Sequence, residues 1–354
     1  MDPSRRALIE HGIDAGTLFR VHNGNNVLEG VHPIDRGSFL EYHCPDAATL
    51  LKILDVQSPI HNLPVNDAIR TFYYRGHRDA DWKLCPSVFR PDSSGHSATA
   101  MQTIDGVVER EIAFYCNFLE AVNAQGGFIE DEAFRELDKH RRNAELAEGF
   151  ALKIEAGLHP SPDFPSAGQM RTLALAQHYN VPTRLLDWTS NPYTALFFAT
   201  ANIDVLNIKS DGDFGVWMIP KILFDAAAQF REFHIIDVSQ FQNANIAAQR
   251  GCFTSRIPAV SKMLAGQATF PVAPEGGRFL HLDEFLTEDF GDELYNRIVR
   301  EVTGKPMLLR LNSNEVDVCR KKLDQLGINW ATLMPNLEGA AKEAARRDRM
   351  NHNF

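Results

Sequence analysis

The chain has 354 residues, of which 44% are hydrophobic and 23% are charged. These values are ordinary for a folded protein and exclude a disordered, collagen-like or disulfide-framework chain. With 36 basic and 46 acidic residues, the formal net charge is −10, which is a poor match to a protein that coats nucleic-acid backbones by bulk electrostatics. Only a local basic pocket would therefore attract anions.

The cysteines and the apolar runs bear on cellular location. The five cysteines are scattered, form no CxxC pair and are odd in number, which argues against a disulfide framework. The N-terminal residues lack the apolar run of a secretion signal, and no stretch approaches about 18 uninterrupted apolar residues. The sequence predicts a soluble, cytoplasmic protein with no membrane partner.

The first half of the chain contains one predicted strand followed by helices. Residues 1–45 mix short apolar pairs with Gly, Asn and Pro, which predicts an irregular extension or weak strands. Asp46 or a neighbour is suited to cap a short helix through AATLLKILDV, and IRTFYYRGH has the composition of a buried strand that ends at Gly76. Helical periodicity over residues 103–122 and helical composition over residues 134–154 predict a helical segment of about residues 103–158.

The second half favours an α+β fold with a mixed or antiparallel sheet. HPSPDFPSAG is a predicted loop, and MRTLALAQHYN a helix that ends at Asn180. YTALFFATA is a predicted helix with Ser190 or Asn191 as N-cap and Pro192 at its first position. Strand-like runs follow at FGVWMI, FHIIDV, ATFPV and MLLRL. Residues 312–326 form an amphipathic helix with an N-x-x-E capping pattern.

Standard catalytic motifs are absent. The sequence has no GxGxxG, GxxxxGK[ST], HExxH or GxSxG. Its 13 histidines offer no ligand spacing with carboxylates or cysteines that would support a zinc or di-iron site. We therefore expect no metal, and a nuclease or other hydrolase is the weakest of the functions considered.

Two segments carry candidate chemistry, and the first is YYRGHRDADWKLCPSVFR. Arg75 and His77 stand at the end of the aromatic strand, and Gly76 between them permits close approach of a backbone or a ligand. A guanidinium there offers a fork for a phosphate pair, while His77 is suited to hydrogen-bond a ribose hydroxyl or a carboxamide. The alternative is structural, with Arg75 paired to an internal carboxylate.

The second segment, LALAQHYNVPTRLLDWTSNPYTALFFAT, places a polar cluster between two apolar helices. One interpretation is a pocket, with an anion near the N–H groups that begin the Asn191 helix. The other is structural, with Arg184 and Asp187 in a buried ion pair and Ser190 or Asn191 as a cap. The cluster has more donors and acceptors than two caps require, and comprises Gln177, His178, Thr183, Arg184, Asp187, Thr189, Ser190 and Asn191.

These segments resemble a known family. YRGH, DWKLCPSVFR and LALAQHYNVPTRLLDWTSNPYTALFFA are similar to the FRG domain, which is named for its (F/Y)-R-G motif, and AAQRGCFTS and LGINWATLMPNLEG resemble two later segments of that family. Met334 and Asn336 depart from the more frequent Phe and Asp. The resemblance implies an FRG-like domain over residues 46–340, between the N-terminal extension and a C-terminal tail at residues 341–354.

The layout is similar to that of ADP-ribosyltransferases, in which a first strand ends in Arg or His, a Ser/Thr-rich strand end enters a helix, and a late strand carries Glu or Gln. The resemblance implies a sheet core of that type and NAD as substrate. Arg75 would then hold the diphosphate, and His77 a ribose or the carboxamide. The strand end around the nicotinamide would comprise Thr189, Ser190 and Asn191, and Gln249 would occupy the late-strand position.

Cleavage of the nicotinamide–ribose bond builds positive charge on the anomeric carbon, which a nearby carboxylate stabilises. Gln249 is neutral, so it would only orient the ribose or the acceptor. Asp187 is the candidate for the missing charge. The implied catalytic residues are therefore Gln249, Asp187 and His77.

We thus expect an NAD-dependent ADP-ribosyltransferase-like enzyme, as a bacterial toxin or antiphage effector that modifies a protein or nucleic-acid acceptor and is controlled by a cognate antitoxin or regulator. The alternative is a module that binds or senses NAD or a related nucleotide without turning it over, which the neutral Gln249 favours. Both require Arg75 and the residues before the Asn191 helix to meet in one cavity.

Overall fold

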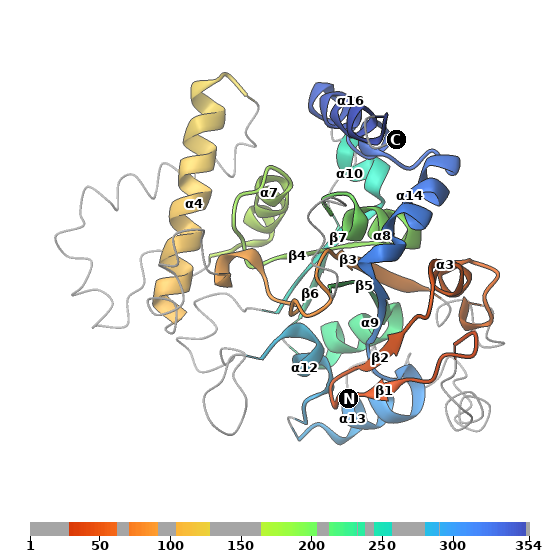
Figure 1. Cartoon of the computed structure of the whole chain (residues 1–354). Coiled ribbons are helices and arrows are strands. Elements are labelled where there is room, and N and C mark those ends of the chain that lie inside the picture. Colours follow the sequence, from red (N-terminus) through yellow and green to blue (C-terminus); the bar gives the residue numbers. More distant parts are fainter. Residues whose placement is uncertain are drawn as a thin grey trace.

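A computed structural model of the chain shows a mixed eight-stranded sheet with helices on both faces (Figure 1). The strands are β1 (Ile34–Asp35), β2 (Leu40–His43), β3 (Phe72–His77), β4 (Leu186–Thr189), β5 (Asp213–Pro220), β6 (His234–Ile236), β7 (Gly251–Ser255) and β8 (Met307–Asn312). Their order is β1-β2-β8-β5-β3-β4-β7-β6. All neighbours are antiparallel except β2 and β8. The expected α+β class is confirmed.

The structure describes residues 28–61, 71–90, 104–127, 164–203, 212–231, 233–237, 244–256, 280–289 and 291–351. The predicted helical residues 134–154 and the strand ATFPV lie outside these ranges. The α-helices within them are α3 (Ala47–Leu54), α4 (Ile104–Ala124), α7 (Ala167–His178), α8 (Pro192–Thr200), α9 (Lys221–Phe230), α10 (Ala244–Gln249), α12 (Leu282–Thr287), α13 (Glu293–Ile298), α14 (Val316–Gln325), α15 (Trp330–Leu333) and α16 (Leu337–Asn351).

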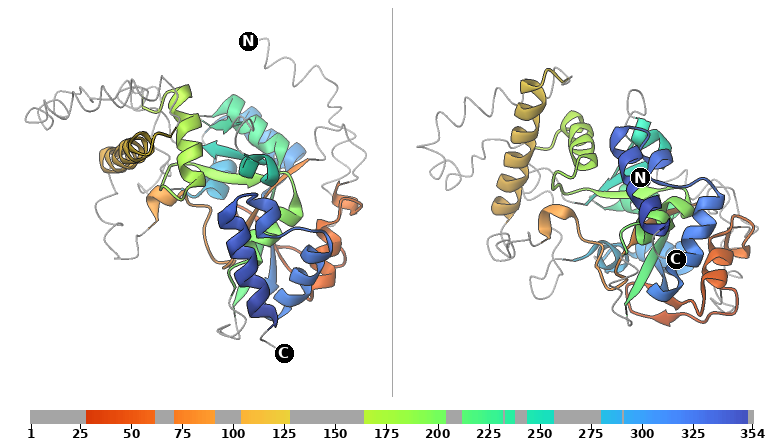
Figure 2. Two further views of the ribbon diagram at one scale, coloured as in Figure 1. Left: turned by 90° about the horizontal axis from the view of Figure 1, so that it is seen from above. Right: turned by 45° about the horizontal axis from the view of Figure 1, so that its top comes forward.

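The two faces of the sheet bury separate apolar clusters. Along β5, Val216 and Met218 pack into the cluster that contains α3, α8 and α14, whereas Trp217 and Ile219 pack into the cluster that contains α9, α12 and α13. This alternation follows from the two-residue period of a strand. A third cluster joins α4 and α7 to the β6–β7 end of the sheet; Figure 2 shows α4 and α7 together at that end, far from α3 and α14.

Several local predictions are confirmed. Asp46 caps α3 by accepting from the Thr49 N–H, and α8 begins at Pro192 with Asn191 as its N-cap. α7 ends two residues before Asn180, which has φ 64°. Each of these ends is specified by a side chain or a backbone preference of the local sequence.

Of the two forms expected for residues 1–45, short strands occur in the described part: β1 pairs with β2, and β2 lies beside β8 inside the sheet. Another expectation is wrong. The N-x-x-E pattern is not a capping box: Asn312 caps a short 3-10 turn (Ser313–Glu315), α14 begins only at Val316, and Glu315 accepts from the Ala47 N–H at 3.0 Å. The Glu315 side chain, which the local pattern assigns to the start of its own helix, therefore makes a long-range hydrogen bond instead.

The predicted C-terminal tail begins inside α16, and its described residues, 341–351, are helical. The carboxylate of Glu343 is buried and accepts from the backbone N–H of Trp330 and from Arg346 and Arg347. A Cβ on Gly339 would lie 1.9 Å from the Met334 carbonyl oxygen. The absence of a side chain at this glycine therefore lets α16 lie directly against α15.

Gly76 has a similar role at the centre of the sheet. A Cβ there would lie 1.9 Å from the carbonyl oxygen of Ala195 and 2.6 Å from the backbone nitrogen of Ala199. Both atoms belong to the backbone of α8, so neither can rotate away. The glycine of the Y-R-G-H string thus sets the distance at which α8 packs on β3.

We predict that Gly76→Ala lowers the free energy of unfolding by about 3 kcal/mol or more, because α8 must shift away from β3. Gly251→Ala is the matched control, since its nearest contact would be an ordinary 3.4 Å to the Trp188 carbonyl oxygen. Urea denaturation of both variants measures the difference. Equal losses of stability in the two would contradict the close-packing role of Gly76.

Candidate functional site

The two candidate segments meet where β3 and β4 separate. The pairing of these strands is confined to Tyr74 with Thr189. Beyond that pair, the guanidinium of Arg75 reaches β4, where Nη1 donates to the backbone oxygen of Asp187 at 2.7 Å and forms an ion pair with its carboxylate. Segments more than a hundred residues apart in the chain therefore meet at one ion pair, as the sequence analysis requires.

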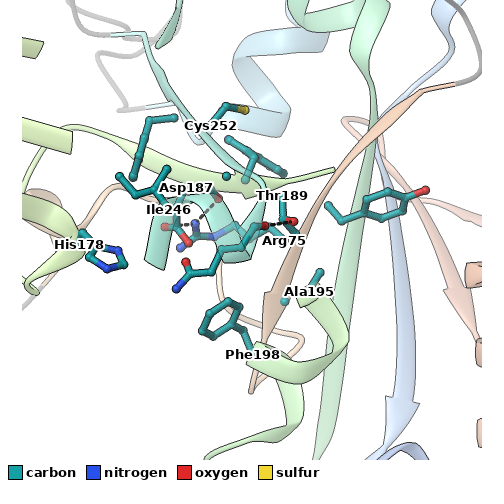
Figure 3. Close-up of a pocket in the computed structure, with 14 residues that line it drawn as sticks. Arg75, His178, Asp187, Thr189, Ala195, Phe198, Ile246 and Cys252 are labelled. Atoms are coloured by element: carbon teal, nitrogen blue, oxygen red, sulfur yellow. Dashed lines mark hydrogen bonds and ion pairs between the residues drawn. The ribbon is translucent and has the colours of Figure 1, made fainter. Parts of the chain in front are cut away.

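Two adjoining cavities surround this ion pair. Figure 3 shows the residues that line the smaller one. The small one has a volume of about 40 Å³ and lies at the β3–β4 separation. The larger one has a volume of about 410 Å³, within the range of small-molecule sites. The residues that line both are Arg75, His178, Asp187, Phe198, Gln249 and Phe253.

Arg75 donates three hydrogen bonds that fix its position. Its Nε donates to His77 Nε2 at 3.1 Å, and its Nη1 donates to both the backbone oxygen and the carboxylate of Asp187. Only 11% of the side chain is exposed. The remaining nitrogen, Nη2, has no hydrogen-bond partner among the described residues, so one end of the guanidinium stays available at the cavity.

His77 lies behind Arg75 and lines neither cavity. Its ring is buried, and because Nε2 accepts from Arg75, the proton sits on Nδ1, which donates to the Trp82 carbonyl oxygen at 3.2 Å. Burial, and then the charges of Arg75 and Arg90, lower the pKa of His77 to about 3. His77 is therefore a neutral side chain that orients Arg75, and direct contact with a ribose or carboxamide, as the resemblance implies, has no support in this geometry.

Among the described residues, Asp187 is the one carboxylate that lines these cavities, and 56% of its side chain is exposed. Its Oδ1 accepts from Arg75 and from Gln177, and Oδ2 has no partner in the described part of the chain. The surrounding protein alone would raise the pKa of Asp187, but the charge and hydrogen bond of Arg75 hold it below the ordinary value. The carboxylate is therefore ionised at neutral pH.

The predicted pair of Arg184 with Asp187 does not form. Arg184 Nε instead contacts Glu111 of α4 at 2.6 Å, with both side chains fully buried. The second Glu111 oxygen accepts from the Arg184 backbone N–H. Arg184 is therefore neutralised by a carboxylate from outside the polar segment, and Asp187 pairs with Arg75 instead.

The three residues at the strand end have different positions. Thr189 lines the small cavity and donates to the backbone oxygen of Gln249 at 2.6 Å. Asn191 caps α8 through the Tyr193 N–H, and its own N–H donates to Thr189. Ser190 is exposed and lines neither cavity. Because these first-turn N–H groups are already used, the expected anion site at the start of α8 has no support in this structure.

Gln249 is not on a late strand, as the layout resemblance implies, but ends α10, and β7 begins two residues later. Its Nε2 donates to the Leu333 carbonyl oxygen at 3.1 Å. Its Oε1 has no donor within the described ranges. Gln249 lines both cavities, so an amide oxygen there can accept a hydrogen bond from a ligand hydroxyl.

Several residues that line the larger cavity have no role predicted from the sequence. Arg90 stands 15 residues after Arg75 and reaches the cavity through a 3-10 turn (Ser87–Phe89) that is bonded to Thr183. Phe198 from α8 contributes an aromatic face, and Trp330 and Lys342 come from the C-terminal helices. Arg90 is the last residue of DWKLCPSVFR, and the resemblance of this segment to the FRG domain could have identified Arg90 as a candidate. Nothing in the local sequence marks Lys342 as a cavity residue.

The comparisons with known proteins support one part of this assignment. Residues 70–207 match the FRG domain family, in agreement with the resemblance of the segments YRGH, DWKLCPSVFR and LALAQHYNVPTRLLDWTSNPYTALFFA. The match includes Arg75, Asp187 and Thr189, but it does not extend to Gln249 or the C-terminal helices, whose resemblance to later family segments stays a prediction. No curated protein and no solved structure gives a significant match.

The part of the chain that the structure describes offers neither a metal-binding cluster nor a membrane-spanning helix. Within the described ranges, no group of three or more His, Cys, Asp or Glu side chains comes together that could hold a metal ion. None of the helices in the part of the chain that the structure describes is long and apolar enough to cross a bilayer.

His77 gives a pH test of this site. Unfolded histidine takes up a proton near its ordinary pKa of about 6.5, whereas native His77 stays neutral down to a pKa of about 3. Lowering the pH from 7 to 5 therefore favours the unfolded state by about 2 kcal/mol through this residue alone. We predict that His77→Gln loses about 2 kcal/mol less than the wild type over this interval, as measured by urea denaturation at both pH values.

All other histidines are present in both proteins, so the difference reports His77 alone. Parallel losses in the wild type and in His77→Gln would mean that native His77 is protonated at pH 5, and would contradict the neutral, Nδ1-protonated ring.

Proposed function

We propose that the larger cavity, together with the small one that adjoins it between β3 and β4, binds NAD and that the protein transfers ADP-ribose to a protein or nucleic-acid acceptor. The observation that carries the proposal is the position of Asp187: an ionised carboxylate with one oxygen without a partner among the described residues, held by Arg75 beside a cavity of about 410 Å³. A carboxylate so placed is suited to stabilise a developing ribosyl cation.

The charges around the cavity support an anionic ligand. The charged residues that line the larger cavity are Arg75, Arg90, Lys342 and Asp187. Three of these are basic, although the whole chain has a net charge of −10. Phe198 adds an aromatic surface that would suit a nucleobase or a nicotinamide ring. An anionic ligand with aromatic rings fits this combination better than a neutral or cationic one.

The chemistry needs few groups. The bond between C1′ of the ribose and the nicotinamide nitrogen breaks, and its electron pair leaves with nicotinamide, which becomes neutral. An acceptor atom then forms the new bond to C1′ and gives up its proton. Asp187 would lower the energy of the cationic transition state, and Gln249 Oε1 would accept from a ribose hydroxyl. His77 contributes through the orientation of Arg75.

A second candidate is a module that binds a nucleotide without turnover. The observation in its favour is Gln249, which is uncharged and whose Nε2 is already committed to the Leu333 carbonyl oxygen. On this view Asp187 is only the counter-ion of Arg75. The two candidates differ in whether NAD is consumed.

We predict that the purified protein releases nicotinamide from NAD and that Asp187→Asn reduces the rate about 100-fold or more. Asn keeps an acceptor for Arg75 and Gln177 but removes the charge. Asp35→Asn is the matched control, because Asp35 forms an exposed ion pair with Lys305 at 2.8 Å, outside both cavities. The measurement is chromatography of the released nicotinamide, with thermal denaturation of each variant.

An unchanged rate in a folded Asp187→Asn protein would remove the proposed catalytic role. NAD binding by calorimetry without release of nicotinamide, in the presence of cell lysate as a source of acceptors, would favour the binding module. If the wild type neither binds nor cleaves NAD, the proposed substrate is wrong.

A further inference from the structure

The larger cavity is lined by a second guanidinium besides that of Arg75, and nothing in the family match assigns it a role. Arg90 lines the larger cavity together with Arg75 and Asp187. Arg75, Arg90 and Asp187 together carry an excess of one positive charge. Lys342, which lines the same cavity, adds another. Arranging two like charges in one partly covered site costs free energy unless an anion joins them.

Arg90 is held in place by the backbone. Its Nε and Nη2 both donate to the Cys85 carbonyl oxygen, at 3.0 and 2.8 Å. The turn that precedes it is bonded to the start of the β4 segment, because the Val88 N–H donates to the Thr183 carbonyl oxygen at 3.1 Å. Arg90 Nη1 has no partner in the described part of the chain and is therefore available to a ligand.

The two arginines resemble each other in this arrangement. Each guanidinium uses two of its nitrogens on fixed protein acceptors and keeps the third without a partner among the described residues. The proximity of their charges also appears in the pKa of Arg90, which burial and then the charge of Arg75 lower, while Asp187 opposes the shift. Side chains anchored in this way lose little conformational entropy when they bind a phosphate.

We infer that Arg75 and Arg90 form a two-guanidinium clamp that takes a diphosphate group, so that the ligand is a nucleoside diphosphate or a dinucleotide and not a nucleoside monophosphate. This rests on the proposed function and assigns a part of the ligand to Arg90. Arg75 borders both cavities, whereas Arg90 borders only the larger one. A group that meets both arginines extends along the larger cavity, which two linked phosphates do better than one.

The inference is tested by calorimetry with ADP and AMP at one fixed salt concentration. We predict that the wild type binds ADP at least about tenfold more tightly than AMP, and that Arg90→Gln removes this difference. Gln can keep a hydrogen bond to the Cys85 carbonyl oxygen, so the variant loses the charge and the fork with little change in fold. Arg78→Gln is the matched control, because Arg78 is exposed, lines neither cavity and lies over Trp82 at 5.2 Å.

Each outcome separates the clamp from the proposed function. Equal affinity for ADP and AMP in the wild type, no ADP binding, or unchanged ADP preference in a folded Arg90→Gln protein would overturn the clamp. An Arg90-dependent ADP preference without nicotinamide release would support the clamp and count against ADP-ribosyl transfer. Release of nicotinamide with a KM for NAD that Arg90→Gln leaves unchanged would overturn the clamp and leave the proposed function standing.

Discussion

The ion pair between Arg75 and Asp187 is the interaction on which the rest of the site depends. It connects two neighbouring strands at the point where their backbone pairing ends, after Tyr74 and Thr189. Neutral His77 supports the guanidinium from one side, and Gln177 adds a second donor to the carboxylate. A sheet that paired fully at this place would have no opening. The same pair therefore holds the strands together and lines the cavity with a charge of each sign.

The parts of this structure that could be predicted from sequence are those with a local cause. The cap of α3 by Asp46, the start of α8 at Asn191 and Pro192, and the aromatic strand β3 each follow from the preferences of a few neighbouring residues. The meeting of the Arg75 strand with the later polar segment was also predictable, but only through the resemblance to the FRG domain. Composition and periodicity alone do not pair distant segments.

The errors have a common physical origin in partners that are distant in the chain. The structural interpretation of the polar segment pairs Arg184 with Asp187, three residues away, yet Glu111 of α4 neutralises Arg184 in the core. Glu315 was expected to cap its own helix and instead accepts from the first residue of α3. A buried polar group takes whichever partner the tertiary fold supplies, and a buried charge without one is too costly to retain. Local patterns identify such residues as polar and buried but do not identify their partners.

The close contact at Gly339 has a consequence for the shape of the larger cavity. It fixes α16 against α15, and these two helices, which bring Trp330 and Lys342 to the cavity, lie beyond residues 70–207. The strands that carry Arg75 and Asp187 and the helices that carry Trp330 and Lys342 are thus separate stretches of sequence. A side chain at residue 339 would displace one side of the cavity and leave the ion pair on the other side in place.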